Sequence, residues 1–411
     1  MSGSSILIDN SHYYKHIIFC MKTLIHYIII IICSTCCVCC DKSQHMQPAN
    51  VINIDVENID TTFDITQLLD FNDKQDLIVL ETNDDSLIGD VSNVIIVKNR
   101  IFIIDNITHS INVYDLNGRF KYKIQHQGRA SNEYIEMTDV YINPSNIYVL
   151  DNSGNKIVVY NLMGSYEYTI DISDYWANNI FVINDIIYLV NKWSESTTGL
   201  YRLFMIDKQG KLLSKQLPFK EKDCNRYYSE ESAYAISDMT YLCYPSDNVI
   251  YTILDNGQCK SYLNIDFQEQ AMPSEYQTME LMETIKYGIH DKYIYGVERI
   301  ASSSRYLFIS YRYQSERYNT IYDNQTKEYH NIKSLNGKNS FHLPLNKYYI
   351  TDNYLVAYVD ANTFFVTTKY SLNDINHEDE FISQVRNIEK RVKDNDNGVL
   401  LLHKLKKCDY E

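Results

Sequence analysis

Few side chains in this 411-residue sequence have the types and spacing that catalysis requires. Its 11 histidines are scattered, and the chain contains neither the H-E-x-x-H pattern of zinc proteases nor the G-x-S-x-G turn of serine hydrolases. The run DNDNG at residues 394–398 looks like the start of a calcium loop, but the glutamate needed at position twelve is missing. We therefore expect no catalytic residues, no bound metal and no cofactor.

A second group of residues could recognise a ligand without transforming it. Aromatic rings beside arginines can stack on sugar rings or hold peptides. The candidates lie in irregular segments between apolar runs, and they are Arg129, Glu133, Trp176, Trp193, Tyr227, Tyr228, Arg312 and Arg317. They can act together only if the fold gathers these segments on one face. The alternative is that they pack between elements or lie scattered.

The elements that position these segments repeat along the chain. Gly118, Gly164 and Gly210 are 46 residues apart, and Gly257 follows after 47, each in a strand-and-turn run such as INVYDLNGRF. Each repeat holds four short runs rich in β-branched and aromatic residues, which in the first repeat cover residues 94–97, 100–105, 111–116 and 120–124. Four strands at a period in the forties are typical of a β-propeller blade. A single blade cannot bury both of its faces, so blades must stack around an axis.

The sequence predicts an all-β protein, a six-bladed β-propeller over residues 51–411. Three repeats are plain, residues 240–267 and 305–332 supply two more, and residues 347–360 open the sixth. The missing strands of the sixth blade are expected from GVLLLHKLK (398–406) and from VINIDV or DLIVLE near the N-terminus, which would close the ring. Helical excursions are predicted at about residues 374–396 and 273–290.

This architecture assigns places to the polar residues. In a blade, the loop between the second and third strands shares one face with the connections between blades, and all eight candidates should lie on that face. Asp105 and Asp151 share a register at the end of the second strand, where we expect them to accept hydrogen bonds from loop N–H groups. Four residues near first strands, Asn93, Asp139, Asn179 and Asp238, could approach the central channel.

The first 50 residues are interpreted as targeting sequence. Lys22 and an apolar run up to about residue 40 predict a signal peptide over residues 21–40, which ends in CVCCDK. Cys40, or alternatively Cys39, is the expected lipidated residue; an uncleaved anchor helix is the other interpretation. Residues 1–20 are interpreted as an extension that precedes the true start at Met21, and residues 41–50 as a tether.

The net charge limits the kinds of macromolecule that the protein can bind, and the number of cysteines limits its disulfide bonds. The formal net charge of −15 excludes a nucleic acid, whose phosphates would be repelled. Four of the ten cysteines lie beyond the targeting segment, at Cys224, Cys243, Cys259 and Cys408, too few for a disulfide scaffold. A Cys243–Cys259 bridge and buried free thiols are both compatible with the sequence.

The segment SLIGDVSNVIIVKNRIFIIDNITHSINVYDLNGRF resembles the first full blade of the six-bladed β-propeller lipoproteins of Bacteroides and relatives, distant cousins of NHL-repeat propellers. In GRASNEY (128–134), Gly128, Glu133 and Tyr134 match the family's turn, whereas Ala130 and Ser131 replace its Gly-Pro. The resemblance extends from about residue 50 to the C-terminus. It implies the propeller fold and a lipid anchor, and it implies no assigned activity.

Two functions from different classes are compatible with these observations. The first is a non-catalytic binding or assembly module, held at the outer membrane of the cell envelope through Cys40, on its periplasmic or surface side, with a glycan or an envelope protein or peptide as ligand. The second is a metal-dependent hydrolase or lyase with its site in the central channel. The lack of a catalytic set favours the first.

Overall fold

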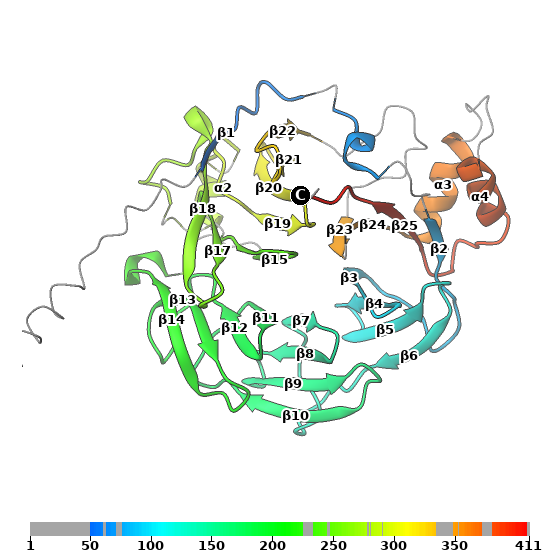
Figure 1. The fold of residues 1–411 in the computed structure, drawn as a ribbon, viewed down its shortest axis with the longest axis horizontal. Coiled ribbons are helices and arrows are strands. Elements are labelled where there is room, and N and C mark those ends of the chain that lie inside the picture. Colours follow the sequence, from blue (N-terminus) through cyan, green and yellow to red (C-terminus); the bar gives the residue numbers. More distant parts are fainter. Residues whose placement is uncertain are drawn as a thin grey trace, which may run out of the picture. The chain divides into compact units, whose positions relative to one another are not determined.

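The computed structural model describes residues 50–60, 63–70, 76–224, 233–244, 247–277, 279, 281–289, 291–333, 348–351, 353–371 and 380–408. Within these residues, six sheets radiate from a common axis (Figure 1). The predicted six-bladed β-propeller of four-stranded antiparallel sheets is therefore confirmed. The predicted signal peptide and the lipidation residue Cys40 lie outside the described residues.

Each of the first five blades runs outward from the axis in chain order. Blade 1 contains β3 (Val91–Val97), β4 (Arg100–Asp105), β5 (Ser110–Asp115) and β6 (Phe120–Ile124). Blade 2 contains β7 (Asp139–Ile142), β8 (Asn146–Asp151), β9 (Lys156–Asn161) and β10 (Tyr166–Asp171). Blade 3 contains β11 (Asn179–Ile183), β12 (Ile186–Val190), β13 (Tyr201–Ile206) and β14 (Leu212–Pro218). Blade 4 contains β15 (Tyr234–Ile236), β16 (Thr240–Leu242), β17 (Val249–Ile253) and β18 (Cys259–Asp266). Blade 5 contains β19 (Arg299–Ser302), β20 (Tyr306–Tyr313), β21 (Glu316–Asp323) and β22 (Tyr329–Ile332).

Blade 6 joins the two ends of the chain. It contains β23 (Tyr348–Thr351), β24 (Tyr354–Val359), β25 (Val399–Lys404) and, outermost, the early strand β2 (Asp76–Val79). The predicted closure by GVLLLHKLK and DLIVLE is thus confirmed. VINIDV has another role, because β1 (Asn50–Asn53) pairs in parallel with β18 as a fifth strand of blade 4. Between β1 and β2, the 3₁₀ helix η1 (Ile65–Leu68) packs into the core between blades 5 and 6.

Six hydrophobic clusters fill the contacts between neighbouring blades, which explains why the strands are apolar on both faces. Many of the 37 tyrosines serve these contacts. Their rings are buried, and their hydroxyls donate to backbone carbonyls, as Tyr114 does to Ser86 (3.0 Å), Tyr134 to His109 (2.7 Å) and Tyr160 to Asn132 (2.7 Å). The tyrosine content therefore reflects the packing of blades as much as any binding surface.

Two kinds of connection divide the ends of the ring into two faces. One side of the ring carries the turns that join the first strand to the second and the third strand to the fourth, and we call this side the turn face. In blade 1 these turns are residues 98–99 and 116–119. The opposite side, the loop face, carries residues 106–109 and 125–138 of the same blade. The repeated glycines lie on the turn face with positive φ, such as +80° at Gly210, where a Cβ would stand 2.6 Å from the carbonyl oxygen of Asp171 in the preceding blade. The repeat glycine therefore allows a tight turn to pack closely on the neighbouring blade.

Buried aspartates organise the loop face, as predicted from their register. Asp105 accepts hydrogen bonds from the backbone N–H groups of Gly89, Asp90, Ile107 and Thr108. Asp151 accepts from Ile135, Glu136 and Gly154. Each aspartate thus joins its own loop to the connection from the preceding blade.

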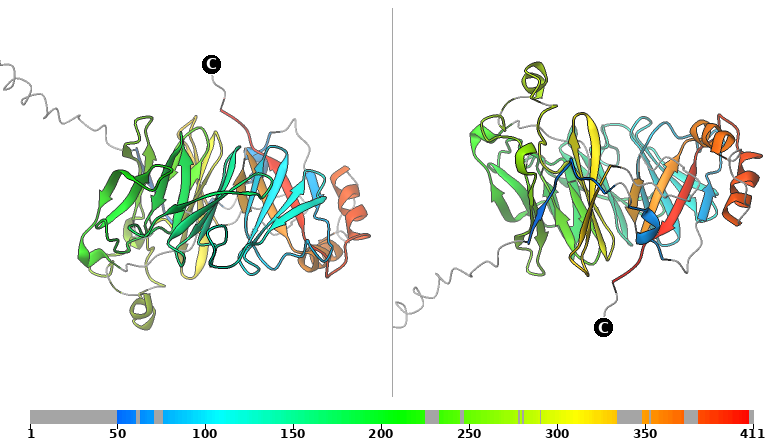
Figure 2. Two further views of the ribbon diagram at one scale, coloured as in Figure 1. Left: turned by 90° about the horizontal axis from the view of Figure 1, so that it is seen from below. Right: turned by 90° about the horizontal axis from the view of Figure 1, so that it is seen from above.

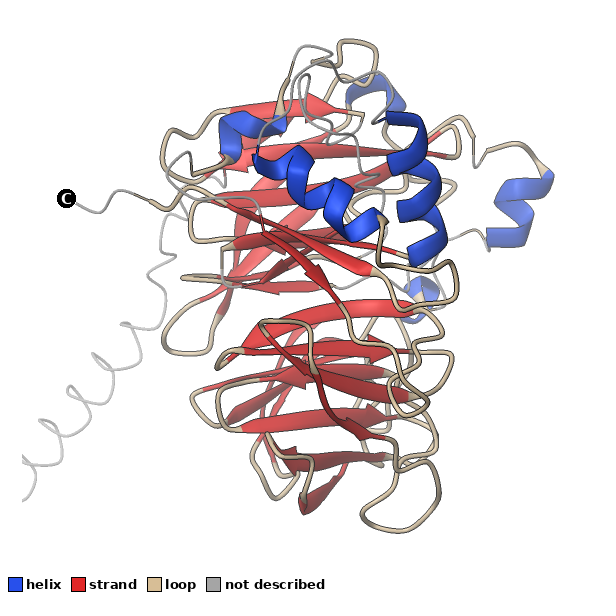
Figure 3. Ribbon diagram, turned by 90° about the vertical axis from the view of Figure 1, so that its right-hand side faces the viewer, coloured by secondary structure: helices blue, strands red, loops and turns tan. Residues whose placement is uncertain are grey.

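The helices are shorter or differently placed than expected. Two of them, α3 (Ala361–Ser371) and α4 (Glu380–Glu389), cover the outside of blade 6 (Figures 2 and 3). The prediction for residues 374–396 includes α4 but misses α3, whose TFFVTT run favours a strand by propensity. Among the described residues of 273–290, α2 (Leu281–Lys286) follows turns at residues 274–277, so the helix is shorter there than predicted. Short 3₁₀ helices η2 (Glu221–Asp223) and η3 (Gln268–Gln270) complete the described elements.

The four later cysteines are all free, so no Cys243–Cys259 bridge is present. Burial raises the pKa of the Cys243 and Cys259 thiols to about 12, which keeps both of them protonated and unreactive at neutral pH.

None of the helices among the described residues has both the length and the apolar character needed to cross a membrane.

His403 on β25 makes stability depend on pH. Its side chain is 5% exposed, its Nδ1 has no hydrogen-bond partner, and burial lowers its pKa to about 4. The folded state therefore favours the neutral ring, and its contribution to stability is complete above about pH 6.5 and is lost as the pH falls towards 4. We expect His403→Leu to remove about 3 kcal/mol of the pH-dependent change in the free energy of unfolding between pH 7 and 4.

Urea unfolding at both pH values measures this change, with His126→Leu, at an exposed position, as the control. Equal pH dependence in wild-type and His403→Leu protein would show that the buried ring does not titrate with folding.

Candidate functional site

The innermost strand of every blade has a free edge. The strands β3, β7, β11, β15, β19 and β23 each stand at the end of their sheet, with a hydrogen-bonded neighbour on one side only. An edge strand presents unpaired N–H and C=O groups. These six edges meet around the axis (Figure 1). The propeller axis is therefore rich in backbone donors and acceptors before any side chain is considered.

Side chains tie neighbouring inner strands together. From β7, Asp139 Oδ2 accepts from Ile180 N (2.9 Å) and the Tyr141 hydroxyl donates to Val182 O (3.0 Å). Between blades 3 and 4, Ala233 N donates a hydrogen bond to Asn179 Oδ1 at 3.4 Å. Burial raises the pKa of Asp139. Asp139 and Asn179, two of the four predicted channel residues, thus bind backbone groups of the adjacent blade.

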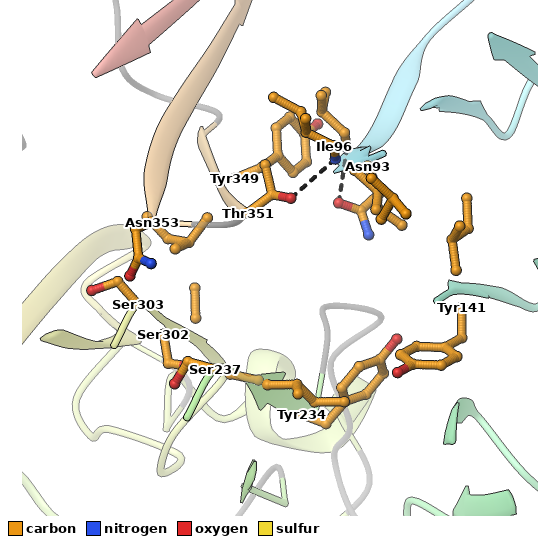
Figure 4. Close-up of a pocket in the computed structure, with 18 of the residues that line it drawn as sticks. Asn93, Ile96, Tyr141, Tyr234, Ser237, Ser302, Ser303, Tyr349, Thr351 and Asn353 are labelled. Carbon is orange, nitrogen blue, oxygen red and sulfur yellow. Dashed lines mark hydrogen bonds between the residues drawn. The ribbon is translucent and has the colours of Figure 1, made fainter. Parts of the chain in front are cut away.

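A cavity of about 580 Å³ lies on the axis and is lined by five of the six inner strands, all except β11 (Figure 4). Its wall includes residues from the turns between first and second strands in five blades, namely Lys98, Pro144, Asp238, Ser304 and Asn353. The cavity therefore lies towards the turn face, on the opposite side from the loops that carry the predicted ligand-binding residues.

The wall of this cavity combines apolar side chains with uncharged polar ones, and its charged residues are Lys98, Asp238 and Arg299. Hydroxyl and carboxamide groups come from Asn93, Ser237, Ser302, Ser303, Thr351 and Asn353. Asn93 uses Oδ1 to accept from Val94 N (2.8 Å), and its amide nitrogen faces the open space (Figure 4). The rings of Tyr141 and Tyr234 lie side by side, with centroids 6.4 Å apart, on another part of the wall.

Two serine hydroxyls of blade 5 are buried and have no hydrogen-bond partner. They are Ser302 Oγ and Ser304 Oγ, both on residues that line the cavity. A buried polar group without a partner costs free energy, which a bound ligand or water can recover. This part of the wall is therefore suited to donate to or accept from a polar ligand.

The described residues of the cavity lining show no arrangement of a nucleophile with a histidine base. They include no histidine or cysteine and only one carboxylate, Asp238. Across the described part of the chain, no group of three or more His, Cys, Asp or Glu side chains could hold a metal ion. The arrangement can bind a ligand through hydrogen bonds and tyrosine contacts.

The described members of the predicted loop-face set differ in their surroundings. Arg129 is exposed, and Trp176 is 42% exposed. Glu133 accepts a hydrogen bond from Ala130 N (2.9 Å) and so holds its own loop. Trp193 is only 4% exposed and packs beside Phe219.

Four of the predicted ligand-binding residues remain, namely Arg312, Arg317, Tyr227 and Tyr228. Arg312 Nε and Arg317 Nη2 approach the same carboxylate, Glu298, at 2.9 and 3.5 Å. Tyr227 and Tyr228 lie outside the described residues. None of the described candidates lines the axial cavity.

Sequence reasoning identified only Asn93 and Asp238 among the residues that line the axial cavity. One further signal was available. The inner strand of blade 5 ends in ASSSR, which places small polar residues where other repeats have longer apolar side chains. A short polar run at the end of an inner strand leaves room on the axis.

The fold and site define a class, a six-bladed propeller with an axial cavity whose described lining contains hydroxyl and carboxamide groups but no histidine or cysteine. The chain belongs to the family described as Domain of unknown function (DUF4934), which matches residues 49–404. No protein with a curated description matches the chain significantly.

Three solved structures are similar to this chain to different degrees. A presumed exported protein from Bacteroides fragilis is 17% identical, with a TM-score of 0.69 over 87% of this chain and 100% of that one. A member of the DUF4221 family from Bacteroides vulgatus is 13% identical, with a TM-score of 0.49 over 82% of this chain and 98% of that one. Virginiamycin B lyase from Staphylococcus aureus is 14% identical, with a TM-score of 0.36 over 63% of this chain and 74% of that one. At 17% identity, the likeness to the Bacteroides fragilis protein shows the shared fold alone.

Proposed function

We propose that this protein is a non-catalytic binding module of the cell envelope that holds an uncharged, hydroxyl-rich ligand, a glycan segment, in its axial cavity. The observation that carries the proposal is the wall of the cavity, where carboxamides, serine hydroxyls and a tyrosine pair surround about 580 Å³ and the charged residues are Lys98, Asp238 and Arg299. Sugars present alternating hydroxyl donors and acceptors, which amide and hydroxyl side chains can match in both directions.

The location is part of the same proposal. The predicted signal peptide with lipidation at Cys40 would attach the protein to the outer membrane, on its periplasmic or surface side. A presumed exported protein among the structural relatives supports export. The distant likeness to NHL-repeat propellers also belongs to this proposal, as do the loop-face candidates, which we propose as a further contact surface of the module.

A channel-metal enzyme has no observation in its favour among the described residues. Two of the four candidate ligands, Asp139 and Asn179, already accept hydrogen bonds from neighbouring backbone. The other two, Asn93 and Asp238, lie in the lining without a third acidic or histidine ligand beside them.

A screen of purified protein, residues 41–411, against glycans and peptides tests the proposal. We expect saturable binding to a glycan, with the mass of the ligand unchanged after prolonged incubation. Selection of peptides alone would contradict the ligand class, and cleavage of the ligand would contradict the non-catalytic role. A bulky substitution at Ser237, which lines the axial cavity, should then weaken binding of the glycan and so locate the site.

A further inference from the structure

A second hollow, of about 520 Å³, lies on the loop face between blades 3 and 4. Its lining comes from the loops and adjoining strand ends of these two blades and from the connection that leaves blade 4. The axial cavity and this hollow share no lining residue. The second hollow is therefore a separate structural feature.

Arg202 on β13 forms part of this lining and is held firmly. Its guanidinium carbon lies 4.8, 4.7 and 5.5 Å from the ring centroids of Trp193, Tyr244 and Tyr251. Its Nη1 donates to Asp247 Oδ2 at 2.6 Å. Rings on several sides and an ion pair at one end fix the orientation of the guanidinium before any ligand arrives.

Arg202 retains donor capacity. A guanidinium has five N–H donors, and the bonds described for this one go to Asp247 and, at 3.2 Å, to the Tyr251 hydroxyl. The side chain is 10% exposed, and Asp247 is 19% exposed. An arginine that is rigid and partly reachable at the bottom of a hollow is suited to receive a planar acceptor such as a carboxylate.

The acidic groups nearby are already engaged. Asp247 accepts from both Arg202 and the Tyr251 hydroxyl, the latter at 3.2 Å. Asp223 accepts from the backbone N–H of Lys220 at 3.3 Å. Lys220 is exposed and belongs to the lining, so it adds a second cation to the hollow.

The rest of the lining would hold the body of such a ligand. Phe219 and Pro218 supply an apolar side, and Phe219 meets Trp193 edge-on at 5.6 Å. Asn248 and Gln277 add carboxamides that can bind hydroxyl or amide groups. The hollow thus combines an apolar side, formed by Trp193, Pro218 and Phe219, with charged and carboxamide groups around it.

The backbone at this hollow is strained. Trp193 has a φ of +67°, a conformation that costs a bulky residue on the order of 1–3 kcal/mol. Asn191 holds the strained turn, since its Nδ2 donates to Ser194 O (2.6 Å) and its Oδ1 accepts from Ser194 N (2.9 Å). In this conformation the indole of Trp193 packs against the guanidinium of Arg202.

We infer that this hollow binds a small organic carboxylate, with the carboxylate between Arg202 and Lys220 and the body of the molecule against Phe219. This inference does not depend on the axial site. A sugar acid and an N-acylated amino acid share this chemistry, and the experiment below distinguishes them.

The two tryptophans of the chain provide a direct readout. In Trp176→Phe protein, all tryptophan emission comes from Trp193, which contacts Arg202. We expect a saturable change in this emission on titration with sodium glucuronate or with N-acetylphenylalanine, and no change with glucose or N-acetylphenylalanine amide. The acid that binds more tightly identifies the body of the ligand.

Two lysines of the same loop give a matched comparison. Lys220→Ala should weaken binding of the acid by roughly tenfold or more, because one charge-assisted hydrogen bond is lost. Lys222→Ala, exposed on η2 and outside the lining, should bind as the parent does. Ser237→Phe, which fills the axial cavity without adding a tryptophan, should also leave this signal unchanged.

Several results would overturn the inference. They are a failure of both acids to change Trp193 emission, an equal response to the neutral partners, unchanged binding in Lys220→Ala, or loss of the signal in Ser237→Phe. The last result would place the acid in the axial cavity instead.

Discussion

Asp105→Ala should lower the free energy of unfolding by about 4 kcal/mol or more. The Asp105 side chain is fully buried and accepts hydrogen bonds from four backbone N–H groups, at 2.6 Å from Gly89, 3.2 Å from Asp90, 2.9 Å from Ile107 and 3.1 Å from Thr108. Each buried donor left without a partner costs about 1–3 kcal/mol. The loss would loosen both the loop of blade 1 and the connection from blade 6.

The charge state of Asp105 follows from the same contacts. Burial raises its pKa, but the hydrogen bonds from Gly89, Thr108 and Asp90 outweigh burial, so the pKa lies below its ordinary value. Asp105→Asn should therefore be destabilising as well, because an amide presents only one acceptor oxygen.

Urea unfolding of the two Asp105 variants measures these losses. Asp84→Ala, at an exposed turn position, serves as the control and should change the free energy of unfolding by less than about 1 kcal/mol. A loss below about 1 kcal/mol in Asp105→Ala would show that the aspartate does not hold the loop face together.

Arg202→Ala is the second substitution with a large expected effect, a loss of about 3–5 kcal/mol in the free energy of unfolding. It removes the cation that pairs with Asp247 at 2.6 Å and leaves that carboxylate mostly enclosed without its partner. Contacts with three aromatic rings are lost at the same time. Burial lowers the pKa of Arg202, but Asp247 and Tyr251 reverse this, so the guanidinium stays charged.

A double variant separates the ion pair from simple packing. Arg202→Met with Asp247→Leu should recover most of the lost stability, because no unpaired charge remains. The surface pair of Lys208 and Asp185, whose side chains are well exposed, gives the comparison, and Lys208→Ala should cost less than about 1 kcal/mol. If the double variant is no more stable than Arg202→Ala, the loss comes from the cavity and not from the unpaired carboxylate.

Sequence periodicity was sufficient to predict most of the architecture. The 46-residue spacing of Gly118, Gly164 and Gly210 marks a turn that packs on the preceding blade, which is a local requirement and leaves a local signal. The pairing of β1 with blade 4 could not be predicted, because a four-residue strand pairs through its backbone and its side chains carry little information about the partner. The helix α3 was missed because packing on blade 6 overrides the strand propensity of its residues.

The candidate sites were harder to predict, for a physical reason. The prediction favoured aromatic and arginine residues in loops, where Trp193 packs beside Phe219 and the exposed Arg312 pairs with Glu298, and a ligand-binding role for these loops stays a prediction. The axial cavity is formed where inner strands from five blades meet, and its residues are ordinary serines, asparagines and tyrosines spread over more than 250 positions. Their convergence follows from ring closure, which no single segment encodes.

The central claim, that the axial cavity binds the ligand, is tested most directly by measuring the dissociation constant of the selected glycan with a cavity-filling variant. Ser237→Trp places an indole on a turn residue that lines the cavity. Ser145→Trp, on an exposed turn of the same face outside the lining, is the matched control. We predict that Ser237→Trp raises the dissociation constant by roughly a hundredfold, about 2.8 kcal/mol, while Ser145→Trp leaves it unchanged. Equal affinity in the two folded variants would contradict the account and place the ligand elsewhere on the propeller.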